Sequence, residues 1–108
     1  MSTTPKRSYF VVFLNPIAGK EAEYDAWYDT HIREVAALDG VLSAQRFAMS
    51  QTQMHPQQYK YAAIYEVELG KEAAALQNML SSFPTESAVA DFANAHSMMI
   101  TSISDLIR

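Results

Sequence analysis

The feature that most constrains the fold is an unbroken apolar run near the start of the chain, residues 9–14 (YFVVFL). Its residue types favour β-structure, and the Asn15-Pro16 pair that follows ends the run. Because successive side chains of a strand point to opposite faces of a sheet, this strand is apolar on both faces. Such a strand needs cover on both sides, which predicts a sheet enclosed between two layers.

The rest of the chain alternates between helical and strand patterns. Apolar spacing predicts one helix from residues 19–20 to a glycine end at 39–40, and a second helix over residues 71–83, interrupted by Pro84. Strands are expected at 41–49, 59–69 and 97–107, and a short helical piece capped by Thr85 is expected at 86–95. The order β-α-β-β-α-β is the ferredoxin-like plan, an α+β fold whose four-stranded antiparallel sheet has its helices on one face.

Two helices can cover only one face of a four-stranded sheet. In the first and third expected strands the other face is also apolar, and an exposed apolar face of that size is unusual in a monomer. The economical arrangement is a homodimer in which two sheets pack face to face. We expect one domain over residues 8–108, preceded by a flexible N-terminus over residues 1–7.

Composition excludes several classes of function. The net charge is −4 and the pI about 5.2, whereas a nucleic-acid partner calls for a basic surface. The chain has no cysteine, which excludes disulfides, thiolate chemistry and Cys-based metal sites. No apolar stretch is long enough to span a bilayer, and no signal-peptide pattern is present. We therefore expect a cytoplasmic protein that binds neither nucleic acid nor a membrane.

The first expected helix carries an aromatic stripe. At about 100° per residue, its aromatic and apolar residues fall within one arc of roughly 100°; they are Tyr24, Trp27, Tyr28, His31, Val35 and Leu38. His31 lies in the middle of this stripe, on the face expected to meet the sheet. Burial among aromatic rings favours a neutral imidazole, which is suited to accept a proton. His31 is therefore the candidate general acid/base, against the alternative of a core histidine held by a carbonyl or a tyrosine hydroxyl.

Three stretches of the first half resemble the EthD-like group of dimeric α+β barrel proteins: Asn15-Pro16, WYDTHI at residues 27–32 and GVLSAQRF at residues 40–47. In that group a helix carries a Trp and a His four residues later, and a Gly-to-Arg passage leads into the second strand. Here Ile32-Arg33 follows the His, where the group often has Pro shortly afterwards. The resemblance implies a dimer with a pocket in each subunit between sheet and helices.

The resemblance also implies a role for the helix histidine. Relatives in the group include cofactor-free polyketide cyclases, lactone isomerases, small quinone-forming monooxygenases and proteins attached to degradation pathways. Pockets in that group are typically lined by catalytic His, Tyr, Asp or Trp residues. The position that carries over most directly is His31, which strengthens its assignment to proton transfer.

Aromatic residues supply the candidate substrate contacts. Trp27, Tyr28 and Tyr24 are candidates for the wall of an apolar pocket, against simple packing. Tyr65 and Tyr61 share one strand face. If that face looks at the helices, their hydroxyl groups are placed to hold a substrate oxygen; if it looks at the dimer, they are interface residues.

Three further residues are candidates for supporting roles. Asp29 lies on the flank of the helix and would have to reach around it to orient His31. A buried Arg46 needs an ion-pair partner or a bound anion, and a structural ion pair is the favoured interpretation. His96, at the entry of the last strand, is either a second acid–base group or a turn residue. The histidines lack ligand spacing, so no metal is expected, and the sequence indicates no cofactor.

These patterns favour a cofactor-independent enzyme that does His-assisted proton transfer, as a lyase, isomerase or cyclase, on a small hydrophobic metabolite, aromatic or carbonyl-bearing. A cofactor-free monooxygenase of the same fold and a non-catalytic accessory or ligand-binding homodimer remain alternatives. A pocket of about 300 Å³ or more beside His31 would favour an enzyme. An imidazole with both nitrogens hydrogen-bonded and no cavity beside it would favour the accessory protein.

Overall fold

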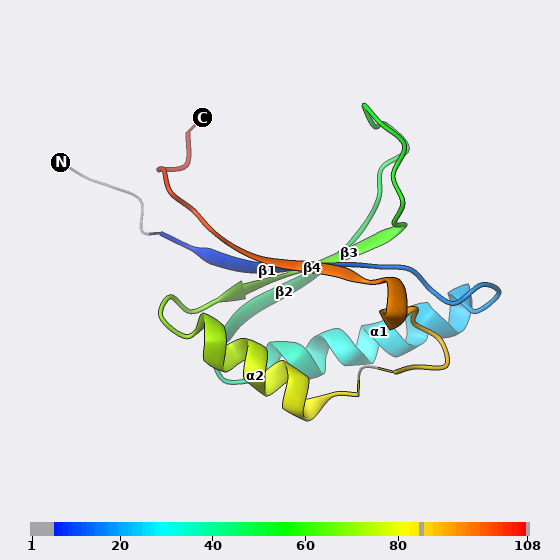
Figure 1. The fold of residues 1–108 in the computed structure, drawn as a ribbon, viewed down its shortest axis with the longest axis horizontal. Coiled ribbons are helices and arrows are strands. Elements are labelled where there is room, and N and C mark those ends of the chain that lie inside the picture. The colour runs from blue at the N-terminus through cyan, green and yellow to red at the C-terminus, as the bar shows by residue number, and fades with distance from the viewer. Residues whose placement is uncertain (1–5, 85, 108) are drawn as a thin grey trace.

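The structure, a computed structural model, describes residues 6–84 and 86–107. Its elements in chain order are β1 (Ser8–Leu14), α1 (Glu21–Ala36), β2 (Val41–Ala48), β3 (Tyr61–Val67), α2 (Glu72–Ser82), a short 3-10 helix η1 (Phe92–Asn94) and β4 (His96–Thr101). This is the β-α-β-β-α-β order predicted from the sequence, so the ferredoxin-like α+β fold is confirmed (Figure 1). Thr85 and most of the expected flexible N-terminus lie outside the described residues.

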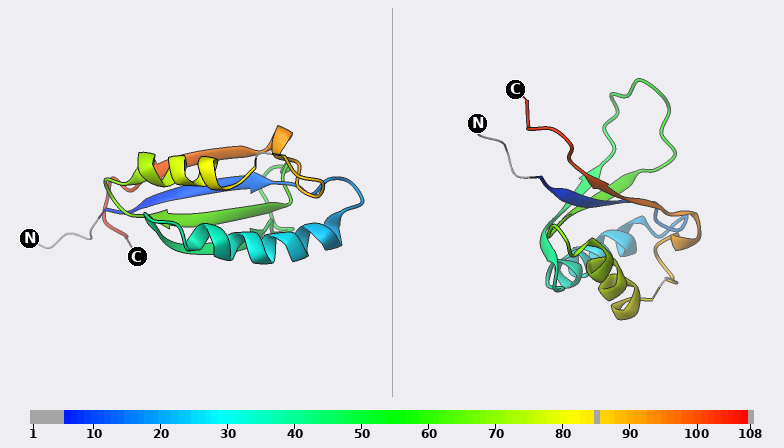
Figure 2. Two further views of the ribbon diagram at one scale, coloured as in Figure 1. Left: turned by 90° about the horizontal axis from the view of Figure 1, so that it is seen from below. Right: turned by 60° about the vertical axis from the view of Figure 1, so that its left-hand side comes forward.

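The four strands form one antiparallel sheet in the order β2-β3-β1-β4. The apolar strand β1 is central, with β3 on one side and β4 on the other, which fits its two apolar faces. Both helices lie on the same face of the sheet, as the two views of Figure 2 show. The loop between β2 and β3 rises on the opposite side (Figure 1).

The core lies between the helices and the sheet. Its fully buried residues include Leu14 from β1, Tyr24 from α1 and Val67 from β3. Tyr65 lies opposite Phe10 in the pairing of β3 with β1, so both point to the helix face. The aromatic stripe of α1 meets this face, because Tyr24 and Tyr28 are buried while the flanking acidic residues remain exposed. The sequence left open which side Tyr61 and Tyr65 face; they face the helices.

The first helix is shorter than its sequence predicts. It was expected to reach residues 39–40 but ends at Ala36. The backbone N–H of Leu38 donates to the carbonyl of Val35, and that of Val41 donates to the carbonyl of Leu38. These tight turns close the helix early and lead directly into β2. The third strand is shorter as well, because β3 spans Tyr61–Val67 and not 59–69.

The predicted helical piece over residues 86–95 is wrong, apart from the single turn of η1. The Ser87 hydroxyl accepts hydrogen bonds from the N–H groups of Val89 and Ala90 and holds a turn. The carbonyl of Val89 then accepts from Ile17, and the N–H of Asp91 donates to Asn15. The backbone groups that a helix would pair internally are therefore used to attach this segment to the end of β1.

The last strand is also shorter than predicted: β4 ends at Thr101 and not at residue 107. Thr101 pairs with Ser8, which is the first residue of β1, and the N–H of Ser102 makes one further bond to Arg7. The ladder ends there because β1 begins at Ser8. A strand needs a partner as well as a suitable residue pattern, and the pattern alone overestimated its length.

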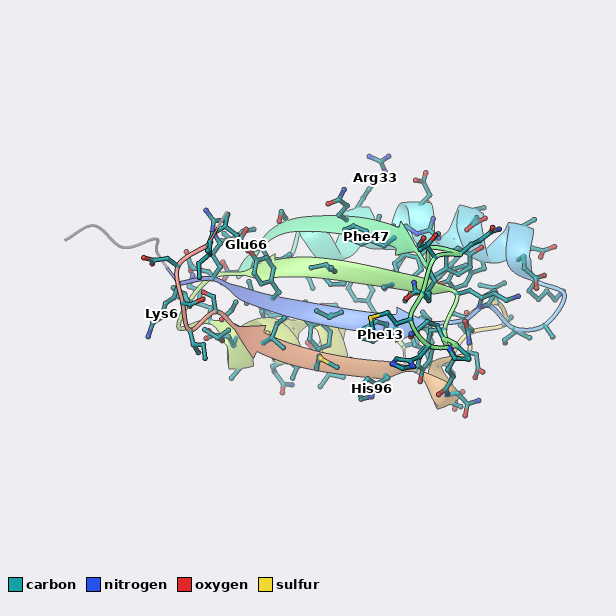
Figure 3. All side chains as sticks on the ribbon, turned by 90° about the horizontal axis from the view of Figure 1, so that it is seen from above. Lys6, Phe13, Arg33, Phe47, Glu66 and His96 are labelled. Atoms are coloured by element: carbon teal, nitrogen blue, oxygen red, sulfur yellow. The ribbon has the colours of Figure 1, made fainter. Side chains whose placement is uncertain are left out.

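The face of the sheet that points away from the helices is apolar at its centre. In the register of β1 with its neighbours, Val11 lies between Ile64 and Met98, and the same face carries Phe13 and Ile100 (Figure 3). Met98 is 39% exposed and Ile100 is 47% exposed. This open apolar face agrees with the pattern that predicted it. No helix in the described part of the chain is long and apolar enough to cross a membrane.

The core between sheet and helices is expected to carry the stability of the fold. Leu14 is 1% exposed, so Leu14→Ala leaves a cavity and should lower the free energy of unfolding by about 2–5 kcal/mol in urea denaturation. Leu80 of α2 is 57% exposed, and Leu80→Ala should cost less than about 1 kcal/mol. Equal losses for the two variants would contradict this placement of the core.

Candidate functional site

A cavity of about 190 Å³ lies between the two helices and the helix-facing side of the sheet. Its walls are mostly apolar and come from β1, α1, β3, α2 and the residues just after it, η1 and β4. The lining residues that carry polar side chains are Tyr28, His31, Tyr65 and Ser97. An apolar hollow with a few convergent polar groups is the usual form of a small-molecule site.

The imidazole of His31 is held between aromatic rings. It stacks on Trp27, with the ring centroids 4.5 Å apart and the planes 13° from parallel. Phe83, just after α2, meets it edge-on at 4.8 Å, and Tyr28 does so at 5.5 Å. The helical spacing of four residues places Trp27 and His31 one above the other on α1. These contacts fix the orientation of the ring beside the cavity.

No residue that the structure describes makes a hydrogen bond to either nitrogen of His31. Burial lowers its pKa below the ordinary value of 6.5, and the charge of Glu34 opposes this change. A lowered pKa keeps the ring neutral near neutral pH, with one nitrogen free to accept a proton. The ring is therefore not the hydrogen-bonded core histidine that the sequence left as the alternative.

Two phenols form the second polar element of the cavity. The hydroxyl groups of Tyr28 and Tyr65 are 3.3 Å apart and share a hydrogen bond, and both side chains are buried. Burial raises the pKa of each phenol, so both remain protonated. The pair can donate one hydrogen bond to the other and still offer a hydroxyl to an oxygen atom in the cavity.

Arg46 packs against this phenol pair through Tyr28 and is not on the cavity lining. Its guanidinium donates to the carboxylate of Asp25 at 3.0 Å and lies 4.9 Å from the centre of the Tyr28 ring. The partner is on α1 of the same chain, so the predicted ion pair is present and does not cross to another subunit. Tyr24 packs beside them, stacked on Tyr61 with the ring centroids 5.3 Å apart.

The structure therefore brings together some of the predicted site residues and separates others. His31, Tyr28 and Tyr65 line the cavity. Three expected substrate contacts, Trp27, Tyr24 and Tyr61, are not on its lining, because they pack behind it as support for His31, Arg46 and one another.

Two candidates for supporting roles, Asp29 and His96, lie elsewhere. Asp29 is exposed on the solvent side of α1 and pairs with Arg33 at 3.9 Å, so it does not reach around the helix to His31. His96 lies on the open face of the sheet, stacked against Phe13 with 6.1 Å between ring centroids (Figure 3). The parity of β4 causes this, because the next residue, Ser97, is the one on the cavity lining.

Sequence reasoning missed the wall that the second half of the chain contributes. Leu76, Met79 and Phe83 line the cavity from α2 and its end, and Phe92 does so from η1. The apolar spacing over residues 71–83 predicts a helix but not a cavity wall, and no pattern in the sequence singles out Phe92. Spacing on one helix cannot show that the opposing helix stands far enough away to leave a space.

The size of the cavity limits what it can hold. At about 190 Å³ it does not reach the roughly 300 Å³ that the sequence analysis set as the size favouring an enzyme, but it is larger than the roughly 150 Å³ of an apolar cavity that admits benzene. It therefore suits a ligand with one ring. Among the described residues, no group of three His, Cys, Asp or Glu is placed to hold a metal ion.

No model of a known protein family matches the sequence, and no curated protein matches it significantly. Solved structures are similar in fold. A "putative monooxygenase" from Shewanella loihica PV-4 has a TM-score of 0.61 at 14% identity, over 94% of this chain and 95% of its own. A DABB-family protein with a ferredoxin-like fold from Mesorhizobium loti has a TM-score of 0.57 at 13% identity, over 92% and 97%.

A third similar structure is a dimeric ferredoxin-like protein of unknown function from Thermobifida fusca, with a TM-score of 0.53 at 7% identity, over 93% of this chain and 94% of its own. At such identities the likeness extends to the fold alone. It covers nearly the whole of each chain, and it agrees with the strand and helix order described above.

The lowered pKa of His31 predicts a change of stability with pH. Below 6.5 the unfolded chain binds a proton at His31 more readily than the folded chain does, so acidification favours unfolding. The loss of stability begins as the pH falls below 6.5, the pKa of the imidazole in the unfolded chain, and it is complete once the pH is below the lower pKa of the folded chain. The wild type should lose more unfolding free energy than His31→Gln over this range. An NMR titration of the ring that gives a pKa at or above 6.5 would contradict the environment described here.

Proposed function

We propose that this protein is a cofactor-independent enzyme that transfers a proton with His31 in the cavity between helices and sheet. The observation that carries the proposal is an imidazole with no hydrogen-bond partner among the described residues, which lines an apolar cavity. A neutral imidazole of lowered pKa is a general base. The resemblance of Trp27 and His31 to the helix residues of EthD-like proteins also supports this proposal.

The chemistry follows from the groups on the lining. His31 takes a proton from the carbon next to a carbonyl, or from the hydroxyl of a phenol, and becomes an imidazolium. The electron pair left behind moves to the oxygen, where a hydroxyl of Tyr28 or Tyr65 donates a hydrogen bond to it. Returning the proton to another carbon isomerises the ligand. Attack of the enolate on a second carbonyl closes a ring, and expulsion of a leaving group is a lyase reaction.

The substrate class follows from the size and polarity of the cavity. About 190 Å³ with apolar walls suits a single-ring or similarly small carbonyl compound, and the polar groups converge on one part of the ligand. No charged side chain is on the lining apart from the titratable His31, which favours a neutral substrate because an unpaired charge is costly in such a site.

A cofactor-free monooxygenase is the second candidate, and the resemblance in fold to the Shewanella "putative monooxygenase" favours it. The first step would be the same, with His31 removing the proton of a phenol. Dioxygen would then oxidise the phenolate, so that one phenol and one O₂ give one quinone and one water. The apolar cavity would admit dioxygen as readily as the ring.

Proton transfer can be tested before the substrate is known. In deuterated water, the wild type should accelerate exchange of the hydrogens next to the carbonyl of cyclohexanone, measured by NMR. His31→Gln should lower this enzymatic rate by about a hundredfold or more, because the base is lost, with circular dichroism unchanged. His55→Gln, in an exposed loop, should behave as the wild type.

Two outcomes of this test would count against the proposal, and a separate measurement of oxygen uptake distinguishes the two candidate functions. Equal exchange rates for wild type and His31→Gln would remove His31 from the mechanism, and no acceleration by the wild type would count against proton abstraction from ketones in this cavity. Oxygen uptake by the wild type with a panel of single-ring phenols, absent in His31→Gln, would select the monooxygenase.

We also propose that two copies of the chain pack through their open sheet faces. The face that carries Val11, Phe13, Met98 and Ile100 is apolar, and both Met98 and Ile100 are partly exposed. Burying such a face is favourable by about 25 cal/mol per Å². The similar Thermobifida structure is dimeric. The cavity is on the other side of the sheet, so the second copy would not line it.

The dimer has a direct test. Met98→Asp places a charge at the centre of the open face and should weaken self-association by about a hundredfold or more, as measured by analytical ultracentrifugation. Leu80→Asp introduces the same charge at an exposed position on α2, on the helix side, and should leave the oligomeric state unchanged. A wild type that is monomeric at high concentration would overturn the proposal.

A further inference from the structure

A cation packs against Tyr28 of the phenol pair and is not itself on the cavity lining. The guanidinium of Arg46, reaching from β2, lies 4.9 Å from the ring centre of Tyr28, 5.7 Å from that of Tyr24 and 5.8 Å from that of Tyr61. Its one ion-pair partner among the described residues is Asp25. The Arg46 side chain is 26% exposed and that of Asp25 is 55% exposed, so water screens the carboxylate more than it screens the cation.

Tyr28 connects this cation with the cavity. One face of its ring is turned to Arg46, and its hydroxyl is hydrogen-bonded to Tyr65 on the cavity lining. The neighbouring hydroxyl of Tyr24 is fully buried and has no hydrogen-bond partner. Tyr24 therefore makes no hydrogen bond to either phenol of the pair. Among the described tyrosines of this cluster, Tyr28 and Tyr65 are the two whose hydroxyl groups are hydrogen-bonded to each other.

We propose that Arg46 is a positioning residue that acts through Tyr28, and that its charge strengthens the phenol pair as a hydrogen-bond donor to a ligand oxygen in the cavity. The inference deepens the proposed function, since it uses the same cavity. It assigns to the cavity a preference for ligands that develop negative charge on oxygen: phenols becoming phenolates and ketones becoming enolates.

The physical reason is the competition between burial and charge. A phenol in apolar surroundings is a weak acid and a weak donor, because its partial negative charge is not stabilised. Burial raises the pKa of Tyr28, whereas the hydrogen bond from Tyr65 and, after it, the charge of Arg46 lower it. A positive charge in a medium of low dielectric acts over several ångströms, so Arg46 can reach the hydroxyl groups without touching the ligand.

The groups that face Tyr28 come from three elements. The titratable or charged ones near it are Tyr24, Asp25 and His31 on α1, Arg46 on β2, and Tyr61 and Tyr65 on β3. Arg46 is the one cation among them when His31 is neutral. Removing its charge should therefore weaken the phenol as an acid, and removing the opposing charge of Asp25 should strengthen it.

A purely structural role for Arg46 predicts something else. If Arg46 only packed on the three tyrosine rings, removing either partner of the Arg46–Asp25 ion pair would loosen the same contact. Arg46→Met and Asp25→Asn would then change the ionisation of Tyr28 in the same direction. The electrostatic and the structural role therefore predict opposite changes in the acidity of Tyr28 when Asp25 is replaced. The acidity of Tyr28 is the quantity that distinguishes them.

The experiment reads this acidity without a substrate. A fluorinated tyrosine is placed at position 28, which brings its ionisation into an accessible pH range, and its ¹⁹F signal is titrated. Arg46→Met should lower the ionisation constant on the order of tenfold. Arg46→Lys, which keeps the charge, should restore most of it, and Asp25→Asn should raise it by a smaller factor because that carboxylate is largely exposed.

The Arg33–Asp29 pair on the same helix is the matched control, since both of its side chains are exposed. Arg33→Met should leave the signal of residue 28 unchanged. The proposal is overturned if Arg46→Met has no effect, or if Asp25→Asn changes the ionisation in the same direction as Arg46→Met. Should Arg46→Met fail to fold, the sign of the Asp25→Asn change alone decides. Because no turnover is measured, loss of the His31 mechanism would not affect this result.

Discussion

The rest of the structure depends on the packing of the aromatic face of α1 against the central strands. Tyr24 and Tyr28 are buried there, against Tyr65 and the apolar residues of β1. Large rings bury much apolar area for few rotatable bonds, so they fix the helix on the sheet at low entropic cost. Where α2 packs on the same face of the sheet, a space of about 190 Å³ remains between the two helices and the strands.

The same packing determines the electrostatics of the site. Burial keeps the His31 ring neutral and the Tyr28 and Tyr65 phenols protonated, so a base and an acid coexist in one cavity without a formal charge. A charged pair in this place would cost more to desolvate than it returned. The cation that the site has, Arg46, is held outside the cavity and is partly hydrated beside Asp25.

Much of this could be read from the sequence, and the failures have physical causes. Strand and helix order followed from periodicity, and the position of His31 on the aromatic stripe followed from helix geometry. Neighbouring elements decided the rest. Residues 86–95 lost their predicted helix to hydrogen bonds with residues 15–17, β4 stopped where β1 begins, and the face of Tyr65 was known only once β3 paired with β1.

Strand parity separates the two surfaces of the sheet. Val11 points to the open face and Val12 to the cavity, and in β4 the adjacent His96 and Ser97 divide in the same way. The helix-side face can therefore hold a ligand while the open face packs against a second copy of the chain. A substitution on one face leaves the side chains of the other face unchanged. The two faces share the backbone of β1, so any coupling between them passes through the stability of the sheet. A paired sheet of this kind fixes the side chains on its two faces, which is what the proposed base and hydrogen-bond donor would need to keep their positions.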